Sequence, residues 1–218
     1  MKILFLGNSY TSFNNMPKML EALIRENGTE VEVHSLTKGG RKLCQNIQDE
    51  NGGSHIELAQ LLQTNVYDIL FLQEQSYLPL VDKTSFEFAA VQLAGEVNAR
   101  RTILYATWGR AEGAELLREH NLTSIGMTKA LYRAYKEVAR LAGAEVSAVG
   151  LCFAKILERD ANAPLYAPDL SHPSYMGSAA AAICHYKRIF GKLPERYSSI
   201  ELDEYYLSLI RDSICELP

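Results

Sequence analysis

The sequence predicts an α/β fold in which helices cover both faces of a parallel sheet, a three-layer α/β/α arrangement. Short apolar segments alternate with segments of helical pattern along the chain, and this alternation is typical of parallel sheets. The apolar segments are continuous, as strands buried on both faces are. No repeat or linker divides the 218 residues, so we expect a single domain spanning residues 1–218.

Five segments have the length and the apolar content of buried strands. Each has five or six residues, an ordinary length for a strand of a globular protein. They are Lys2–Leu6, Glu30–Ser35, Asp68–Leu72, Thr102–Ala106 and Glu145–Val149.

The first predicted helix shows the helical pattern most clearly. It runs from about Asn15 to Asn27, with apolar side chains at helical spacing. Pro17 lies in the first turn, where its missing N–H costs no hydrogen bond, and Gly28 follows the end. Further helices are predicted at Ser54–Gln63, Ser85–Ala99, Ser124–Ala142, Ser174–Phe190 and Ser199–Ile214. The last one covers the sheet or another helix, or it joins two copies as a homo-oligomer; the sequence leaves these alternatives open.

The overall charge argues against a nucleic-acid partner. The chain has 26 Asp and Glu against 22 Lys and Arg, a formal net charge of -4, whereas binding to phosphates needs a basic surface. No segment is long and apolar enough to span a bilayer, and the N-terminus does not follow the signal-peptide pattern. We therefore expect a cytoplasmic protein without nucleic-acid or membrane partners.

We also expect no metal and no cofactor. The histidines include no pair at metal-ligand spacing. The four cysteines form no C-x-x-C pair, and the glycine motifs of nucleotide-binding proteins are missing from the sequence. The chemistry is therefore expected to come from the side chains of the chain itself.

Polar residues and glycines follow the first four predicted strands, at the sheet edge where such folds bind ligands. These segments are Gly7-Asn8-Ser9-Tyr10-Thr11, Lys38-Gly39-Gly40-Arg41, Gln73-Glu74-Gln75-Ser76 and Thr107-Trp108-Gly109-Arg110. A fifth polar segment, Asp169-Leu170-Ser171-His172-Pro173, precedes a predicted helix.

Ser9 and His172 are candidates for a nucleophile and its base. A serine at a strand-to-loop turn can expose its hydroxyl, but it needs a base to attack a substrate. Asp169 can hold one ring nitrogen of His172 and leave the other free to take the serine proton. The alternatives are structural: Ser9 makes turn hydrogen bonds, and residues 169–173 lead into a helix capped by Ser174.

Three further positions can supply hydrogen-bond donors. Gly40 can turn a backbone N–H toward a ligand. Gln73 and Gln75 follow the third predicted strand, and we expect one of them to face Ser9, where its amide can donate to a developing oxyanion. Glu74 between them is expected to be exposed.

Arg41 and Trp108 are candidates for substrate contacts. Arg41 belongs with Lys38 and Lys42 to a small positive cluster, which either attracts an anionic substrate or is a solvated rim. Trp108 opens the long connection 107–124. It either stacks on a sugar or lines an acyl pocket, or it lies in the core.

Taken in order, these residues resemble the SGNH (GDSL-like) hydrolase superfamily. Gly7-Asn8-Ser9-Tyr10 is similar to its first block, G-D-S-L, with Asn8 in place of the usual Asp. Gly40 corresponds to the glycine of the second block, and Asp169-Leu170-Ser171-His172-Pro173 to the last block, D-x-x-H. The resemblance covers essentially the whole chain, and it implies a flavodoxin-like sheet of five parallel strands in the order 2-1-3-4-5.

The resemblance implies catalytic roles for three residues. Ser9 is the nucleophile, His172 is the base, and Asp169 orients His172. No metal takes part.

The oxyanion hole that the resemblance implies combines backbone and side-chain donors. The N–H groups of Ser9 and Gly40 are joined by a side-chain amide, which in the family belongs to the Asn of a G-x-N-D block. This sequence lacks that block. A simple alignment places Gln75 at the position of the Asn, and Gln73 stays an alternative.

A serine esterase is the function that the resemblance implies. It hydrolyses small acyl esters, for example acetyl esters of carbohydrates, through an acyl-enzyme on Ser9, and Asn8, Trp108 and Arg41 contact the substrate. The missing G-x-N-D block keeps a second hypothesis open: a non-hydrolytic protein that binds a small sugar or another small metabolite on the same scaffold.

Overall fold

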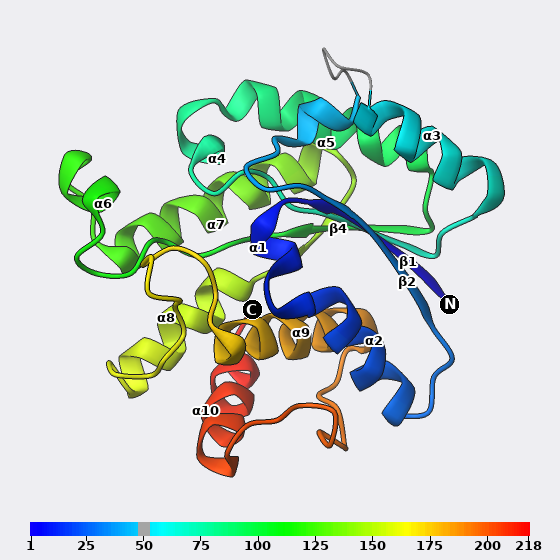
Figure 1. Ribbon diagram of the computed structural model, residues 1–218. Coiled ribbons are helices and arrows are strands. Elements are labelled where there is room, and N and C mark those ends of the chain that lie inside the picture. Colours follow the sequence, from blue (N-terminus) through cyan, green and yellow to red (C-terminus); the bar gives the residue numbers. More distant parts are fainter. Residues whose placement is uncertain (48–52) are drawn as a thin grey trace.

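The computed structural model describes residues 1–47 and 53–218. Within these ranges, parallel strands form one five-stranded sheet in the order β2-β1-β3-β4-β5 (Figure 1). The predicted strand order is confirmed. The strands are β1 (Lys2–Gly7), β2 (Glu32–Thr37), β3 (Ile69–Leu72), β4 (Arg101–Tyr105) and β5 (Glu145–Ser147).

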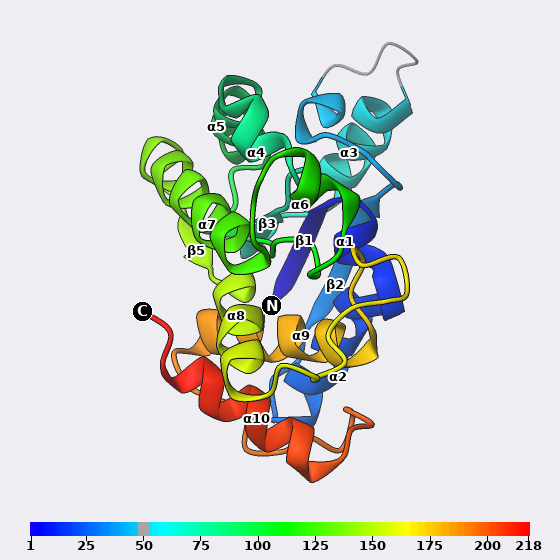
Figure 2. The same ribbon diagram turned by 90° about the vertical axis from the view of Figure 1, so that its left-hand side faces the viewer.

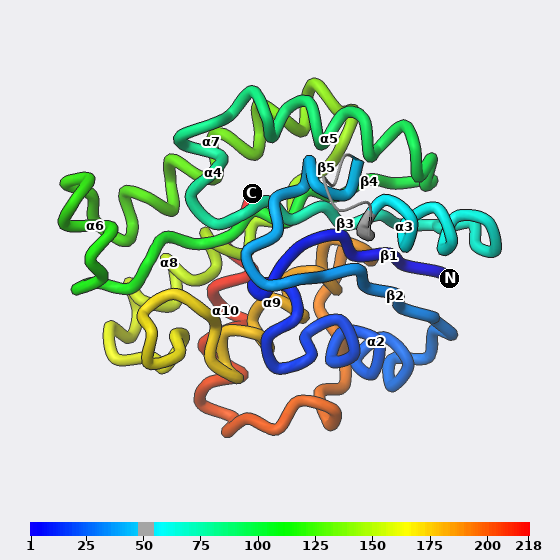
Figure 3. Tube along the Cα trace, turned by 45° about the horizontal axis from the view of Figure 1, so that its top comes forward, coloured from blue at the N-terminus to red at the C-terminus, as the bar shows by residue number. Residues whose placement is uncertain are grey.

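Helices cover both faces of the sheet, as predicted (Figure 3). One layer consists of α2 (Met16–Glu26), α8 (Val149–Arg159), α9 (Tyr175–Phe190) and α10 (Glu204–Cys215), and the other of α3 (Gly53–Thr64), α5 (Lys83–Val97) and α7 (Ser124–Leu141). The connections contain the short helices α1 (Ser9–Ser12), α4 (Leu78–Val81) and α6 (Glu115–Glu119), and the 3-10 turns η1 (Phe13–Asn15) and η2 (Leu43–Asn46). None of the described helices is long and apolar enough to cross a bilayer.

Strand β1 shows why its sequence is continuously apolar. Ile3 and Phe5 pack on the side of α2 and α9, whereas Leu4 and Leu6 pack on the side of α5 and α7. All four are fully buried, and Phe5 stacks on Phe71 of β3 with ring centroids 4.5 Å apart. Burial of both faces stabilises the sheet. Because the strands are parallel, the carboxyl ends of β1, β3 and β4 lie at one edge of the sheet.

The structure differs from the prediction at the fifth strand. β5 ends at Ser147, and Val149, predicted as its last residue, begins α8. The sequence pattern does not predict a helix there, because a short apolar segment fits a buried strand or a buried helix equally well. Cys152, Phe153 and Ile156 form the face of α8 that is buried in the core.

The C-terminal helix α10 packs on other helices of the chain. Its residues Leu207, Ile210 and Ile214 are buried, and the helix contacts α8 and α9 (Figure 2). The structure therefore fits the alternative in which this amphipathic segment covers another helix.

Candidate active site

Ser9 and His172 come from distant parts of the chain and meet at the carboxyl edge of the sheet. Ser9 is the first residue of α1, directly after the β1 turn, and His172 lies in the connection between α8 and α9. This connection runs beside α1 (Figure 2). The Oγ of Ser9 lies 2.8 Å from Nε2 of His172, the hydrogen-bond distance that a nucleophile and its base require.

Asp169 holds the other side of the His172 ring. Its Oδ2 is hydrogen-bonded to Nδ1 of His172, and its Oδ1 accepts from the backbone N–H groups of His172 and Ser171 at 2.9 and 3.0 Å. Burial raises the pKa of the Asp169 carboxyl, but these hydrogen bonds outweigh burial, and the pKa lies below its usual value. A charged carboxylate keeps the ring proton on Nδ1, so Nε2 is free to accept the proton of Ser9.

Two aromatic rings fix the plane of His172. Phe13 lies face to face with it, with 4.2 Å between the ring centroids, and Tyr10 meets it edge to face at 5.4 Å. Phe13 is not among the residues that the sequence motifs predict for the site. A single aromatic residue four positions after Ser9 gives no sign of where its side chain points.

Asn8 and Gln73 build the turn after β1. Asn8 Oδ1 accepts from the Tyr10 N–H at 3.1 Å, and Asn8 Nδ2 donates to the backbone oxygen of Arg41 at 3.0 Å. Gln73 Oε1 accepts from the Asn8 N–H and from Oγ1 of Thr11, both at 2.9 Å. Both side chains are committed to the turn. Asn8 also lines the cavity beside Ser9, whereas Gln73 uses its amide nitrogen within the chain, since its Nε2 donates to the backbone oxygen of Glu74 at 2.6 Å.

Gly40 and Gln75 line the cavity beside Ser9. Gly40 has a φ of +68°, a conformation that favours glycine. Gln75 Oε1 accepts from the N–H groups of Tyr77 and Leu78 at 3.3 and 3.2 Å. Because these two donors fix which end of the amide is oxygen, Nε2 is the end left to donate elsewhere. Of the two predicted glutamines, Gln75 is the one beside Ser9.

Glu74 is fully buried, contrary to the expectation that it is exposed. Its Oε1 accepts from the N–H groups of Leu43 and Gln75 at 3.1 and 2.6 Å. It thereby ties the segment after Gly40 to the segment that carries Gln75. Burial raises the pKa of the Glu74 carboxyl to about 7, because a charge in the apolar interior is poorly solvated.

Trp108 lies in the core, which is one of the alternatives that its place in the sequence left open. Its side chain is fully buried and stacks on Tyr10 and Phe153, at 5.0 and 4.2 Å between ring centroids. Its Nε1 donates to the backbone oxygen of Ser171 at 3.0 Å. Trp108 therefore supports the segment that carries His172 from behind.

Arg110, which the sequence analysis did not single out as a site residue, lines the cavity, and Arg41 does not. The side chain of Arg41, a predicted substrate contact, is buried instead, and its Nη1 donates to Oδ1 of Asn46 at 3.4 Å. Arg110 Nη2 donates to Oγ of Ser76 at 3.0 Å. In the sequence, Arg110 is marked as a site candidate only by its place shortly after a strand. Arg41 has the same kind of place, so this feature does not distinguish the two.

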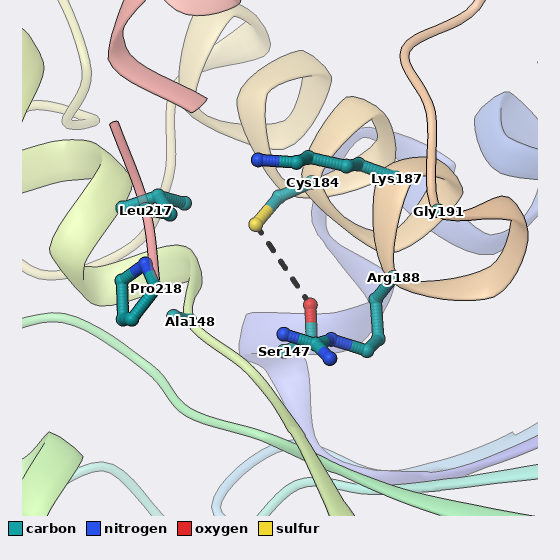
Figure 4. Close-up of a pocket in the computed structure, with 8 residues that line it drawn as sticks. All are labelled: Ser147, Ala148, Cys184, Lys187, Arg188, Gly191, Leu217 and Pro218. Carbon is teal, nitrogen blue, oxygen red and sulfur yellow. Dashed lines mark hydrogen bonds between the residues drawn. The ribbon is translucent and has the colours of Figure 1, made fainter. Parts of the chain in front are cut away.

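A second cavity, near the end of α9, lacks the features of a catalytic site (Figure 4). Ser147 Oγ is hydrogen-bonded to Cys184 Sγ at 3.8 Å and to Nδ1 of the buried His185 at 2.8 Å. Burial raises the pKa of the Cys184 thiol to about 11 and lowers that of His185 to about 3. Neither a thiolate nor a base near neutral pH is therefore present there. No metal-binding group of His, Cys, Asp or Glu side chains occurs in residues 1–47 and 53–218.

Comparison with solved structures identifies similar proteins over most of the chain. A candidate SGNH hydrolase from Slackia heliotrinireducens is 27% identical with a TM-score of 0.75, over 87% of this chain and 98% of that one. A DUF4886 family protein from Bacteroides uniformis is 18% identical with a TM-score of 0.81, over 98% and 93% of the two chains. An acetylxylan esterase from Geobacillus stearothermophilus is 18% identical with a TM-score of 0.62, over 89% and 96%.

These similarities confirm the resemblance to SGNH hydrolases that the sequence indicates. The shared feature is the five-stranded parallel sheet in the order 2-1-3-4-5 with helices on both faces. The similar solved structures include hydrolases and esterases. No protein-family model and no curated protein matches the sequence.

Proposed function

We propose that this chain, which has the fold of SGNH hydrolases, is a serine esterase that hydrolyses small acyl esters. The observation that carries the proposal is the hydrogen-bonded series from Ser9 through His172 to Asp169, at the rim of a cavity. We keep residues 1–218 as one catalytic domain in this proposal, because the site combines residues from distant parts of the chain.

In the proposed reaction, His172 Nε2 takes the proton of Ser9 Oγ as that oxygen attacks the ester carbonyl. His172 then gives the proton to the leaving alcohol, which leaves an acyl group on Ser9. Water, deprotonated by His172, attacks the acyl-enzyme and releases the carboxylic acid. The ester C–O bond is broken, and the elements of one water molecule are added.

The oxyanion that forms during attack requires donors at a fixed position. We assign this role to the backbone N–H groups of Ser9 and Gly40 and to Nε2 of Gln75. Ser9 is the first residue of α1, so its N–H has no acceptor within that helix. Gln75 takes the part that the Asn of G-x-N-D has in the family.

A short acyl group fits the proposal, because the cavity beside Ser9 has a volume of about 170 Å³. Acetyl esters of carbohydrates are the example offered by the similar solved structures, two of which are acetylxylan esterases. The alcohol that the enzyme accepts is left to experiment.

A fluorophosphonate probe tests the proposal, because it reacts with activated serines. Intact-mass analysis of the wild type is compared with Ser9→Ala and His172→Ala, and with Ser12→Ala, which removes an exposed hydroxyl from the same short helix. We expect one adduct on the wild type and on Ser12→Ala, and none on the other two variants. Ester hydrolysis is expected to fall about a thousand-fold or more in Ser9→Ala.

An adduct that persists in Ser9→Ala contradicts the assignment of the nucleophile. If the folded wild type shows no adduct and no hydrolysis but is stabilised against heat by a sugar, it is a binding protein on this scaffold instead.

A further inference from the structure

Arg110 brings a positive charge to the cavity beside Ser9. It lies in the connection after β4, and its side chain is partly buried. Its Nη2 donates to Oγ of Ser76 at 3.0 Å, and its guanidinium carbon lies 5.7 Å from the centre of the Tyr10 ring. The hydroxyl contact and the cation–π contact hold the guanidinium in place before a ligand binds.

The charge of Arg110 is not neutralised by the described part of the chain. The hydrogen bonds of Glu112 and Asp169 go to other groups: Glu112 accepts from the N–H of Ser124 at 2.8 Å, and Asp169 binds His172. Among the described residues Arg110 forms no ion pair, and its Nε is buried without a hydrogen-bond partner. A cation that is partly removed from water without a counter-charge is unfavourable, so this wall of the cavity favours an anion.

We propose that Arg110 binds a carboxylate on the acyl part of the substrate, so that the enzyme hydrolyses half-esters of short dicarboxylic acids. This inference rests on the proposed esterase function. A guanidinium presents paired N–H donors that match the two oxygens of a carboxylate. Its other polar neighbours in the cavity, Ser76 and Gln75, are neutral. One positive charge with neutral donors complements a carboxylate better than a phosphate dianion.

We assign the carboxylate to the acyl side of the ester. His172 must lie beside the leaving oxygen, because it returns the proton to the alcohol. It is covered by Phe13, whose side chain is 37% exposed, so the alcohol side opens to solvent. Arg110 instead lies over the ring of Tyr10, which is buried. An acetyl group carries no charge to pair with this guanidinium, whereas a four-carbon acyl chain that ends in a carboxylate does.

The test compares two methyl esters of nearly equal size. Monomethyl succinate carries the carboxylate, and methyl levulinate carries a neutral methyl ketone in its place. Hydrolysis of the succinate ester breaks the ester C–O bond and gives methanol and succinate, with water as the other reactant. Methanol release measured by proton NMR gives kcat/KM for both. We expect the wild type to prefer the succinate ester about tenfold or more, the effect of one charge-assisted pair.

Three variants separate the contact from the general charge of the protein. Arg110→Gln is expected to lower the ratio of the two kcat/KM values about tenfold, and Arg110→Lys to restore part of it, because lysine keeps the charge but not the paired donors. Lys38→Gln removes an exposed charge near Gly40 and should leave the ratio unchanged. Both esters are measured on one preparation, so a partly unfolded variant does not change the ratio.

Each result decides the inference. Equal rates for the two esters in the wild type, or an equal loss of both in Arg110→Gln, overturns it while leaving the esterase intact. If the fluorophosphonate probe labels Ser9 but neither ester is hydrolysed, the proposed substrate class is wrong and the esterase proposal stands. Absence of both labelling and hydrolysis removes the esterase proposal and this inference with it.

Discussion

Phe13 covers one face of the His172 ring, with 12° between the two planes. The candidate base is therefore positioned by an aromatic residue from the same turn region as the candidate nucleophile. This contact leads to a first prediction.

Phe13→Ala should lower kcat for ester hydrolysis about tenfold, because a displaced catalytic group is costly even when it is still present. Phe13 is partly exposed, so its loss should change the melting temperature little. Phe13→Tyr keeps the stacked ring and is the matched control. Steady-state kinetics and thermal melting check both variants, and equal kcat values in Phe13→Ala and Phe13→Tyr would contradict a positioning role.

Gln75→Glu isolates the amide donor. The new carboxylate can still accept from the N–H groups of Tyr77 and Leu78, but it no longer offers a donor to the oxyanion. We expect kcat to fall about a hundredfold or more, the usual cost of one oxyanion donor, with the melting temperature preserved. Activity close to that of the wild type would show that the oxyanion does not depend on Gln75.

Gln73→Leu is the comparison for Gln75→Glu. It removes the acceptor of the Asn8 N–H and of the Thr11 hydroxyl from a buried position. Its main effect should therefore be a lower free energy of unfolding, on the order of 1–3 kcal/mol.

Glu74 should make the stability of the protein depend on pH. Its pKa of about 7 in the folded state exceeds the ordinary value of 4.5, so between these values the folded protein retains a proton that the unfolded chain releases. The free energy of unfolding should fall as pH rises from about 4.5 to about 7, by at most about 1.4 kcal/mol per pH unit from this group, and then level off.

Urea unfolding of the wild type and of Glu74→Gln at several pH values measures that contribution. The variant keeps an acceptor for the N–H groups of Leu43 and Gln75 but does not titrate. The difference between the two slopes is assigned to Glu74. Parallel slopes would mean that the Glu74 carboxyl does not bind its proton more tightly in the folded state.

Trp108→Phe distinguishes a core role from a substrate contact. Phenylalanine keeps the stacking with Tyr10 and Phe153 but loses the donor to the Ser171 carbonyl. We expect a loss of stability of about 1–2 kcal/mol, measured by urea unfolding, and no increase in KM. A higher KM at unchanged stability would instead support contact between this side chain and the substrate.

Sequence patterns predicted the buried strands and the parallel sheet, and the family resemblance supplied both the strand order, which is confirmed, and the proposed roles of three site residues. Buried parallel strands leave a continuous apolar signal, and Ser9, Asp169 and His172 stand at fixed places relative to predicted elements. The end of β5 was misplaced because the apolar residues on both sides of Val149 fit either kind of element.

The rest of the site depends on contacts between distant segments. Arg41 and Arg110 both follow a strand by a few residues, and only the packed structure distinguishes them, since Asn46 holds one and Tyr10 lies beneath the other. Trp108 is similar: its neighbours Tyr10 and Phe153 are remote in the sequence, so its burial could not be derived from its local pattern.

The candidate base His172 and its hydrogen-bond partner Asp169 share one irregular segment, which other parts of the chain hold in place through Trp108 and Ala111. The Ala111 N–H donates to the oxygen of Leu170 at 2.9 Å, as Trp108 Nε1 does to that of Ser171 at 3.0 Å. Such segments can open without unfolding of the whole domain. If this one opens, Ser9 loses both partners together while the sheet stays intact. Heat inactivation can therefore precede global melting, and it is reversible as long as the sheet remains folded to receive the segment again.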